Sequence, residues 1–105
     1  MTDFVVEFRH GDCVGADEQA HLVASAFGFR IVIHPPTDTK LRAYCAFAEK
    51  VCLSRPFLER NRDIVDASDV IIAAPKTSVE ELRSGTWTTI RYARKANKTL
   101  EILQP

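Results

Sequence analysis

The chain has 105 residues, and its 14 basic and 14 acidic residues cancel to a formal net charge of zero. With 46% hydrophobic and 27% charged residues, it has the composition of a globular protein, and its length fits a single domain, 1–105. No apolar run approaches the ~20 residues that span a bilayer, and no signal-peptide pattern is present, so we expect a cytoplasmic protein without a membrane partner. The missing basic excess disfavours nucleic-acid binding without excluding it.

The three cysteines, Cys13, Cys45 and Cys52, predict neither a disulfide nor a metal site. An odd number of cysteines in a chain without an export signal argues against disulfide bonds. Structural zinc sites have four ligands and a C-x2–4-C spacing, which is missing here. We therefore expect no metal and no cofactor.

The first predicted elements are a strand over 4–8, rich in β-branched and aromatic residues, and a helix over 16–27. An apolar stripe at helical spacing indicates this helix, and Gly28 is expected to end it. The stripe consists of Ala16, Ala20, Val23 and Phe27.

A second strand is expected over 29–33, where Pro35-Pro36 stops it. The next prediction is a helix over 39–49 with one apolar side, followed by a loop over 51–56. That apolar side consists of Leu41, Tyr44, Cys45 and Ala48.

The second half of the chain predicts a helix from residue 56 or 57 to 67, because proline suits a first helical turn. A continuous apolar strand over 70–74 follows, and then a polar loop over 75–85. A last helix and a last strand are expected over 86–97 and 99–103.

Strands that alternate with helices predict an α/β protein, a Rossmann-like three-layer sandwich with a mainly parallel sheet of about four strands. In such a sheet, ligands bind beyond the carboxyl ends of the strands. Three segments of interest fall at that edge.

The first segment is the loop Gly11-Asp12-Cys13-Val14-Gly15-Ala16-Asp17. Its two glycines permit tight turning, and the helix that follows offers unpaired N–H groups to a phosphate. Asp17 and His21 lie four residues apart on this helix. Asp17 is equally well interpreted as an acid favoured by the helix dipole, and His21 mainly as a surface histidine.

The second segment is the helix that carries Arg60, Asn61 and Arg62. Asn61 lies between Leu58 and Val65 on an apolar stripe, where an unpaired buried amide would cost ~1–3 kcal/mol. Its amide therefore either ties down a neighbouring loop or faces a ligand. The two arginines can bind a phosphate through bidentate hydrogen bonds. Alternatively, they pair with acids on the same helix and belong to a solvated face, and the two interpretations are equally good.

The third segment is the turn Arg83-Ser84-Gly85-Thr86, which presents hydroxyl and N–H groups at the start of a helix. The preceding Glu80 and Glu81 are candidates for acid–base chemistry or sugar contact, or they simply keep the loop soluble. On the last helix, Trp87 lies on a stripe that is either a dimer surface or covered within the fold. That helix ends in four cations without an acid, namely Arg91, Arg94, Lys95 and Lys98, which suit a helix C-terminus.

Taken together, these segments resemble the SLOG superfamily, which contains the DprA/Smf DNA-processing proteins, the LOG phosphoribohydrolases and the YpsA-like proteins. The strings "HGDCVGAD", "FLERNRDIVDASDVIIAAP" and "RSGTWTTIRYARK" occur in the order seen in that superfamily. The chain is similar to the small stand-alone members of bacteria and phages over 8–105.

The resemblance implies a Rossmann-like fold that binds a nucleotide or nucleoside phosphate. With the patterns above, it places the ligand contacts at Gly11, Asp12, Gly15, Ala16, Asp17, Asn61, Arg62, Arg83, Ser84, Gly85 and Thr86. LOG enzymes cleave the N-glycosidic bond of a nucleoside 5′-monophosphate with an arginine and a Gly-Gly-x-Gly-Thr-x-x-Glu motif. Here Thr89 stands in place of that glutamate, so the catalytic candidates are Glu80, Glu81 and Arg60.

Three functions follow from this reasoning. The leading one is a nucleotide-binding domain, with N-glycosidase activity as its enzymatic form. The second is a nucleotide sensor or a DprA-like module for single-stranded DNA, and the third is a structural domain without activity. Relatives begin with a further strand and a glycine turn, so we expect either a shortened domain or a site that a partner subunit completes, as in a homodimer.

Overall fold

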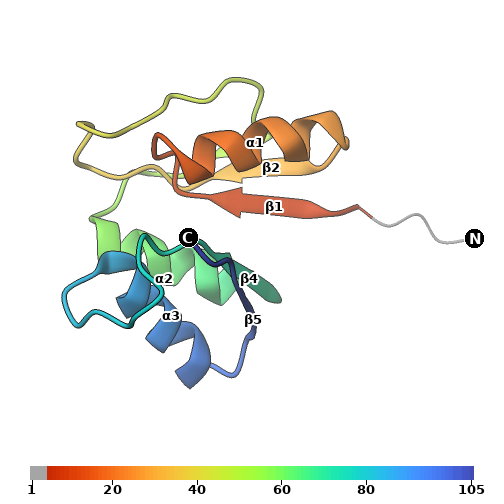
Figure 1. Ribbon diagram of the computed structural model, residues 1–105. Coiled ribbons are helices and arrows are strands. Elements are labelled where there is room, and N and C mark those ends of the chain that lie inside the picture. The colour runs from red at the N-terminus through yellow and green to blue at the C-terminus, as the bar shows by residue number, and fades with distance from the viewer. Residues whose placement is uncertain (1–4) are drawn as a thin grey trace, which may run out of the picture. The chain divides into compact units, whose positions relative to one another are not determined.

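β-branched runs and amphipathic segments produce the expected mixed α/β architecture across residues 5–105, the part of the chain that the computed structural model describes (Figure 1). The single sheet of about four strands is not seen. The described strands instead form one parallel sheet of three and one of two. The contacts within the chain divide after Pro56 into an N-terminal and a C-terminal unit, each described by itself below.

The N-terminal unit consists of β1 (Glu7–His10), α1 (Ala16–Ala26), β2 (Arg30–Ile33) and β3 (Lys50–Val51). The strands are parallel in the order β1-β2-β3, and His10 pairs with Ile33 at the carboxyl end of the first two. A core of Ala24, Ile31 and Ile33 lies between α1 and the sheet. The expected strand over 4–8 begins later, and Phe4 lies outside the described residues.

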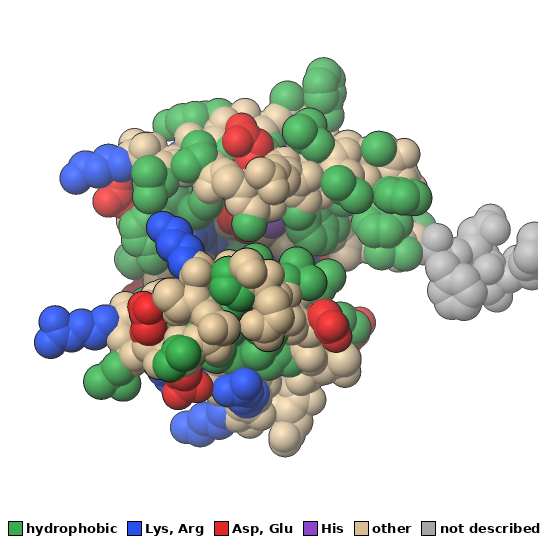
Figure 2. All heavy atoms as spheres, viewed as in Figure 1, with side chains coloured by type: hydrophobic (Ala, Val, Ile, Leu, Met, Phe, Trp, Pro, Cys, Tyr) green, Lys and Arg blue, Asp and Glu red, His purple; other side chains and the backbone are tan. Residues whose placement is uncertain are grey.

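Helix α1 buries His21 and Ala24 rather than the whole predicted apolar stripe. Val23 and Phe27 of that stripe are 58% and 73% exposed, and Figure 2 shows hydrophobic side chains on the surface of this unit. His21 can take a core position because its ring has two hydrogen-bond partners, described below. The prediction that His21 lies on the surface is therefore wrong.

The predicted end of α1 is confirmed. Gly28 has a φ of +74°, in the left-handed region that glycine adopts without strain. The N–H of Gly28 donates to the carbonyl of Ser25, and that of Phe29 donates to Ala24, each over 3.0 Å. This pair of bonds is a Schellman motif, which turns the chain directly into β2.

The predicted helix over 39–49 is wrong, because this segment is irregular. Tyr44 and Phe47 have φ values of 55° and 65°, which a right-handed helix cannot contain. The segment instead forms hydrogen bonds to Asp12. The N–H of Ala43 donates to the Asp12 carbonyl over 2.7 Å, and the N–H of Cys45 donates to the Asp12 carboxylate over 2.9 Å. The periodic apolar residues of the segment reflect packing, since Cys45 and Ala48 contact the core.

The C-terminal unit consists of α2 (Phe57–Ala67), β4 (Val70–Ala73), α3 (Gly85–Lys95) and β5 (Thr99–Ile102), with β4 and β5 parallel. Its elements match the sequence prediction closely. Trp87 is 5% exposed and packs with Ala73 and Ile90, so its stripe is covered within the fold. Among residues 5–105, no helix is long and apolar enough to cross a membrane.

Asp12 is fully buried and also accepts a bond from Arg42 Nε over 2.9 Å. Burial alone would raise its pKa, but the Cys45 N–H and the Arg42 guanidinium outweigh burial and hold the pKa of Asp12 below its usual value. The carboxylate therefore stabilises the fold above an unfolded pKa of about 3.9, and this contribution is lost as the pH falls toward the lower folded pKa.

The Asp12→Asn variant is expected to lose about 2–3 kcal/mol of unfolding free energy at pH 7, because Arg42 loses a buried counter-charge. Urea denaturation of both proteins between pH 3 and pH 7 measures this difference, which should shrink below about pH 4. Asp38→Asn is the matched control, since Asp38 is an exposed acid on the same segment. Equal losses in the two variants would contradict the role given to Asp12.

Candidate functional site

Each unit contains one turn that leads from a strand into a helix, and these two turns, with the helix starts that follow them, hold most of the predicted ligand contacts. Residues 11–15 connect β1 to α1, and residues 74–84 connect β4 to α3. Both turns lie at the carboxyl end of a parallel strand, where α/β sheets bind ligands. Their hydrogen bonds differ sharply.

The N–H groups of the first turn are engaged within the protein. Asp17 Oδ2 accepts from the N–H of Gly11 and of Cys13, each over 3.1 Å. The N–H of Asp12 donates to His10 Nδ1 over 2.9 Å. The carboxylate of Asp17 thus holds the position that a phosphate oxygen takes in an anion-binding turn.

The predicted phosphate contacts at Gly11, Asp12, Gly15, Ala16 and Asp17 lie together around this turn. Gly15 has a φ of +95°, so the entry into α1 needs glycine for its conformation. Phosphate binding here remains a prediction, and it requires displacement of the Asp17 carboxylate.

The second turn borders a pocket of about 490 Å³ in the C-terminal unit. Five of the predicted site residues line it: Asn61, Glu81, Ser84, Gly85 and Thr86. Four residues that the sequence reasoning did not single out for a site complete the lining: Phe57, Leu58, Lys76 and Thr77. A sequence signal for Lys76 and Thr77 does exist. The predicted strand is followed by a polar loop and then by a helix, which places the whole loop at the carboxyl end of the strand.

Asn61 fixes one wall of this pocket. Its Oδ1 accepts from Arg60 Nε over 2.7 Å, and its Nδ2 donates to Thr89 Oγ1 over 3.0 Å. The Thr89 hydroxyl donates in turn to the carbonyl of Gly85 over 2.9 Å. The amide therefore ties α2 to the first turn of α3, and Asn61 also lines the pocket. Contact of the amide with a ligand stays a prediction.

The remaining predicted residues of this unit are not part of the lining. Arg60 is 5% exposed and stacks over the Phe57 ring at 5.5 Å, and Arg62 stacks over Tyr92 at 5.3 Å. Glu80 forms ion pairs of 3.5 Å with Arg91 and 3.4 Å with Arg94. Two of the four cations near the end of α3, Arg91 and Arg94, therefore have an acidic partner, contrary to the sequence expectation. Arg83 is exposed in the loop before α3.

The two helices differ in charge at their first turns. Asp17 and Glu18 occupy the first turn of α1, whereas α3 has no acid there. Ser84 caps α3 by accepting from the N–H of Trp87 over 3.3 Å. The positive end of the α3 dipole thus faces the pocket lining without an acid of its own helix to offset it.

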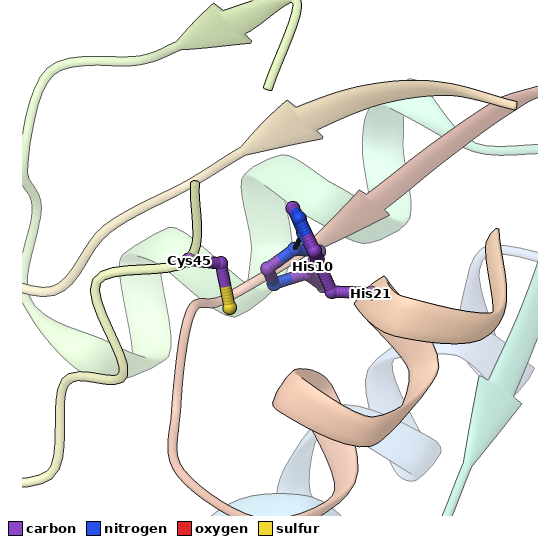
Figure 3. Close-up of side chains that lie close together, drawn as sticks. All are labelled: His10, His21 and Cys45. Carbon is purple, nitrogen blue, oxygen red and sulfur yellow. Dashed lines mark hydrogen bonds between the residues drawn. The ribbon is translucent and has the colours of Figure 1, made fainter. Parts of the chain in front are cut away.

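The N-terminal unit also contains a cluster of potential metal ligands, which the sequence does not predict because its members are far apart in the chain. His10 at the end of β1, His21 on α1 and Cys45 on the irregular segment bring their ligand atoms within 4.8 Å of one another (Figure 3). Both histidines are 3% exposed. Burial, together with the neighbouring Asp12 carboxylate, raises the pKa of Cys45 to about 11.

Hydrogen bonds assign the tautomers of this histidine pair. His10 Nδ1 accepts from the Asp12 N–H, so the ring proton of a neutral His10 resides on Nε2. His10 Nε2 therefore donates to His21 Nδ1 over 2.8 Å, and His21 Nε2 donates to the carbonyl of Ala46 over 2.7 Å. We call this chain of bonds the histidine relay.

Comparisons of the chain with protein-family models, curated proteins and solved structures find no match.

Replacement of Asp17 by alanine is expected to destabilise the chain by about 1–2 kcal/mol, because the N–H groups of Gly11 and Cys13 lose their shared acceptor. Glu18→Ala is the control: it removes an exposed acid from the same turn and should cost about 0.5 kcal/mol or less. Chemical denaturation gives both values. Similar losses in the two variants would mean that Asp17 acts only through the helix dipole.

Proposed function

We propose that the C-terminal unit binds a phosphate-bearing ligand of nucleotide type in the pocket at the start of α3. One observation carries the proposal. Five of the residues expected from the sequence line a single pocket, and Lys76 adds a cation to it. Its volume of about 490 Å³ falls in the range of small-molecule sites.

The phosphate is assigned to the turn Ser84-Gly85-Thr86. The first four N–H groups of a helix have no acceptor within the helix, and the helix dipole attracts negative charge to them. The first turn of α3 contains no acid, so an anion meets no repulsion from it. Lys76 supplies a positive charge from the loop that follows β4.

The rest of the ligand is assigned to the other side of the pocket. Phe57 and Leu58 offer an aromatic ring and an aliphatic side chain, which suit a nucleobase. Glu81 and Asn61 offer polar groups, and a carboxylate is the group that nucleotide-binding α/β folds use for ribose hydroxyls. Membership of the SLOG superfamily is part of this proposal, and it rests on the three motifs of the sequence.

The binding test is a titration followed by backbone amide NMR, with adenosine 5′-monophosphate as the probe and adenosine as its phosphate-free control. The N–H signals of Gly85 and Thr86 are expected to shift with the monophosphate and not with adenosine. Shifts at Gly11 and Cys13 with none at Gly85 and Thr86 would place the site at the first turn. No shift at either turn with any of the common nucleoside monophosphates refutes the proposal.

A Lys76→Ala variant should weaken this binding about tenfold, the loss of one charge-assisted interaction of about 1.4 kcal/mol. Lys95→Ala is the matched control, because Lys95 lies in the last turn of α3 and should leave the affinity unchanged. Isothermal titration calorimetry measures both affinities.

Hydrolysis of the N-glycosidic bond is the second candidate function, and the position of Glu81 in the pocket favours it. A carboxylate beside the ribose stabilises the oxocarbenium-like transition state as the base leaves and water attacks the sugar carbon. Glu80 is engaged with two arginines, so Glu81 is the stronger candidate of the pair.

Incubation of the chain with nucleoside monophosphates should release free base, and Glu81→Gln should reduce the rate at least about 100-fold. Glu80→Gln is the control variant and should retain most of the activity. Binding without base release would leave a nucleotide-binding protein and eliminate the hydrolase.

A further inference from the structure

The cluster of His10, His21 and Cys45 is independent of the pocket above, since all three residues belong to the N-terminal unit. Each comes from a different segment: β1, α1 and the irregular segment between β2 and β3. Figure 3 shows the Cys45 side chain beside the two imidazole rings. Their ligand atoms lie within 4.8 Å of one another.

We propose that these three side chains bind one Zn²⁺ ion through His10 Nε2, His21 Nδ1 and Cys45 Sγ. Two imidazole nitrogens and a thiolate are a donor set that zinc prefers, and three protein ligands leave the fourth tetrahedral position to water or an added ligand. With Zn–N bonds of ≈ 2.0–2.1 Å, the two nitrogens must be about 3.3 Å apart. The two nitrogens are 2.8 Å apart in the structure. An increase of about half an ångström in this distance therefore accommodates the ion.

His21 already has the form that a zinc ligand needs. Its Nε2 proton is held by the carbonyl of Ala46, which leaves the lone pair of Nδ1 directed at the cluster. Backbone carbonyls commonly orient metal-binding histidines in this way, because they fix both the tautomer and the ring angle.

His10 must change its tautomer. Coordination through Nε2 moves the single ring proton to Nδ1, which then no longer accepts from the N–H of Asp12. The N–H of Asp12 then faces a second donor, so it must turn away from the ring and loses its acceptor. This cost is small beside the binding free energy of structural zinc sites. The ion replaces the Nε2–H···Nδ1 bond between the two rings with two Zn–N bonds.

Cys45 binds as a thiolate, so each zinc ion that enters displaces the thiol proton to solvent. The thiolate and the ion leave one net positive charge at the cluster. The buried carboxylate of Asp12 lies close by, since it accepts from the N–H of Cys45 over 2.9 Å. It offsets that charge without itself being a ligand.

The test uses the full chain freed of metal with a chelator and titrated with Co²⁺, a coloured substitute for zinc. We expect one ion per chain, a thiolate-to-cobalt charge-transfer band and the strong visible bands of tetrahedral cobalt. Addition of Zn²⁺ should abolish these bands, and competition with a chromophoric chelator gives the zinc affinity.

Cys45→Ser removes the sulfur ligand with little change in shape, and it should lower the zinc affinity at least about 100-fold and abolish the charge-transfer band. Cys52→Ser is the matched control, because Cys52 is another partly buried cysteine outside the cluster. Far-ultraviolet circular dichroism without metal confirms that both variants fold.

A cluster that serves only as a hydrogen-bonded core gives a different result. The wild-type chain then shows no charge-transfer band, or it binds cobalt with the weak colour of octahedral coordination. Either result overturns the proposal, as does an unchanged zinc affinity in Cys45→Ser. None of these results bears on nucleotide binding by the C-terminal unit.

Discussion

The N-terminal unit is organised around one buried carboxylate. Asp12 occupies a left-handed conformation with a φ of 59° at the end of β1, and its backbone and side chain bind three residues of the segment over 42–45. That segment forms no regular structure of its own, so its N–H groups need partners elsewhere. The irregular segment, the position of Cys45 and the lowered pKa of Asp12 all depend on this one group.

The two strand-to-helix turns share a glycine near the start of a helix but differ in their hydrogen bonds. Both combine glycine with a helix start, which is the arrangement that binds anions. In the first turn an aspartate of the helix satisfies two N–H groups internally, at Gly11 and Cys13. In the second turn the helix starts with Gly85-Thr86 and carries no acid, and a pocket lies beside it. The first turn thus has an internal carboxylate acceptor, which the start of α3 lacks on its own helix.

Most helices and strands could be predicted because local patterns determine them. Gly28 ends α1, Ser84 caps α3, and the apolar run of β4 lies between two helical patterns. The segment over 39–49 could not be predicted, since its apolar spacing fits a helix while Tyr44 and Phe47 adopt positive φ values. Hydrogen bonds to distant groups, above all to Asp12, stabilise that irregular conformation. The same limit applies to the cluster of His10, His21 and Cys45, which tertiary contacts assemble from three segments that no spacing rule connects.

The histidine relay also has a kinetic consequence for the N-terminal unit. Both of its ring protons are shielded from water, since His10 and His21 are each 3% exposed. The Nε2 proton of His21 can exchange with solvent only when the carbonyl of Ala46 moves away. Ala46 lies in the irregular segment beside Phe47, which is 97% exposed. We therefore expect exchange at this imidazole to require a local opening of that segment rather than global unfolding.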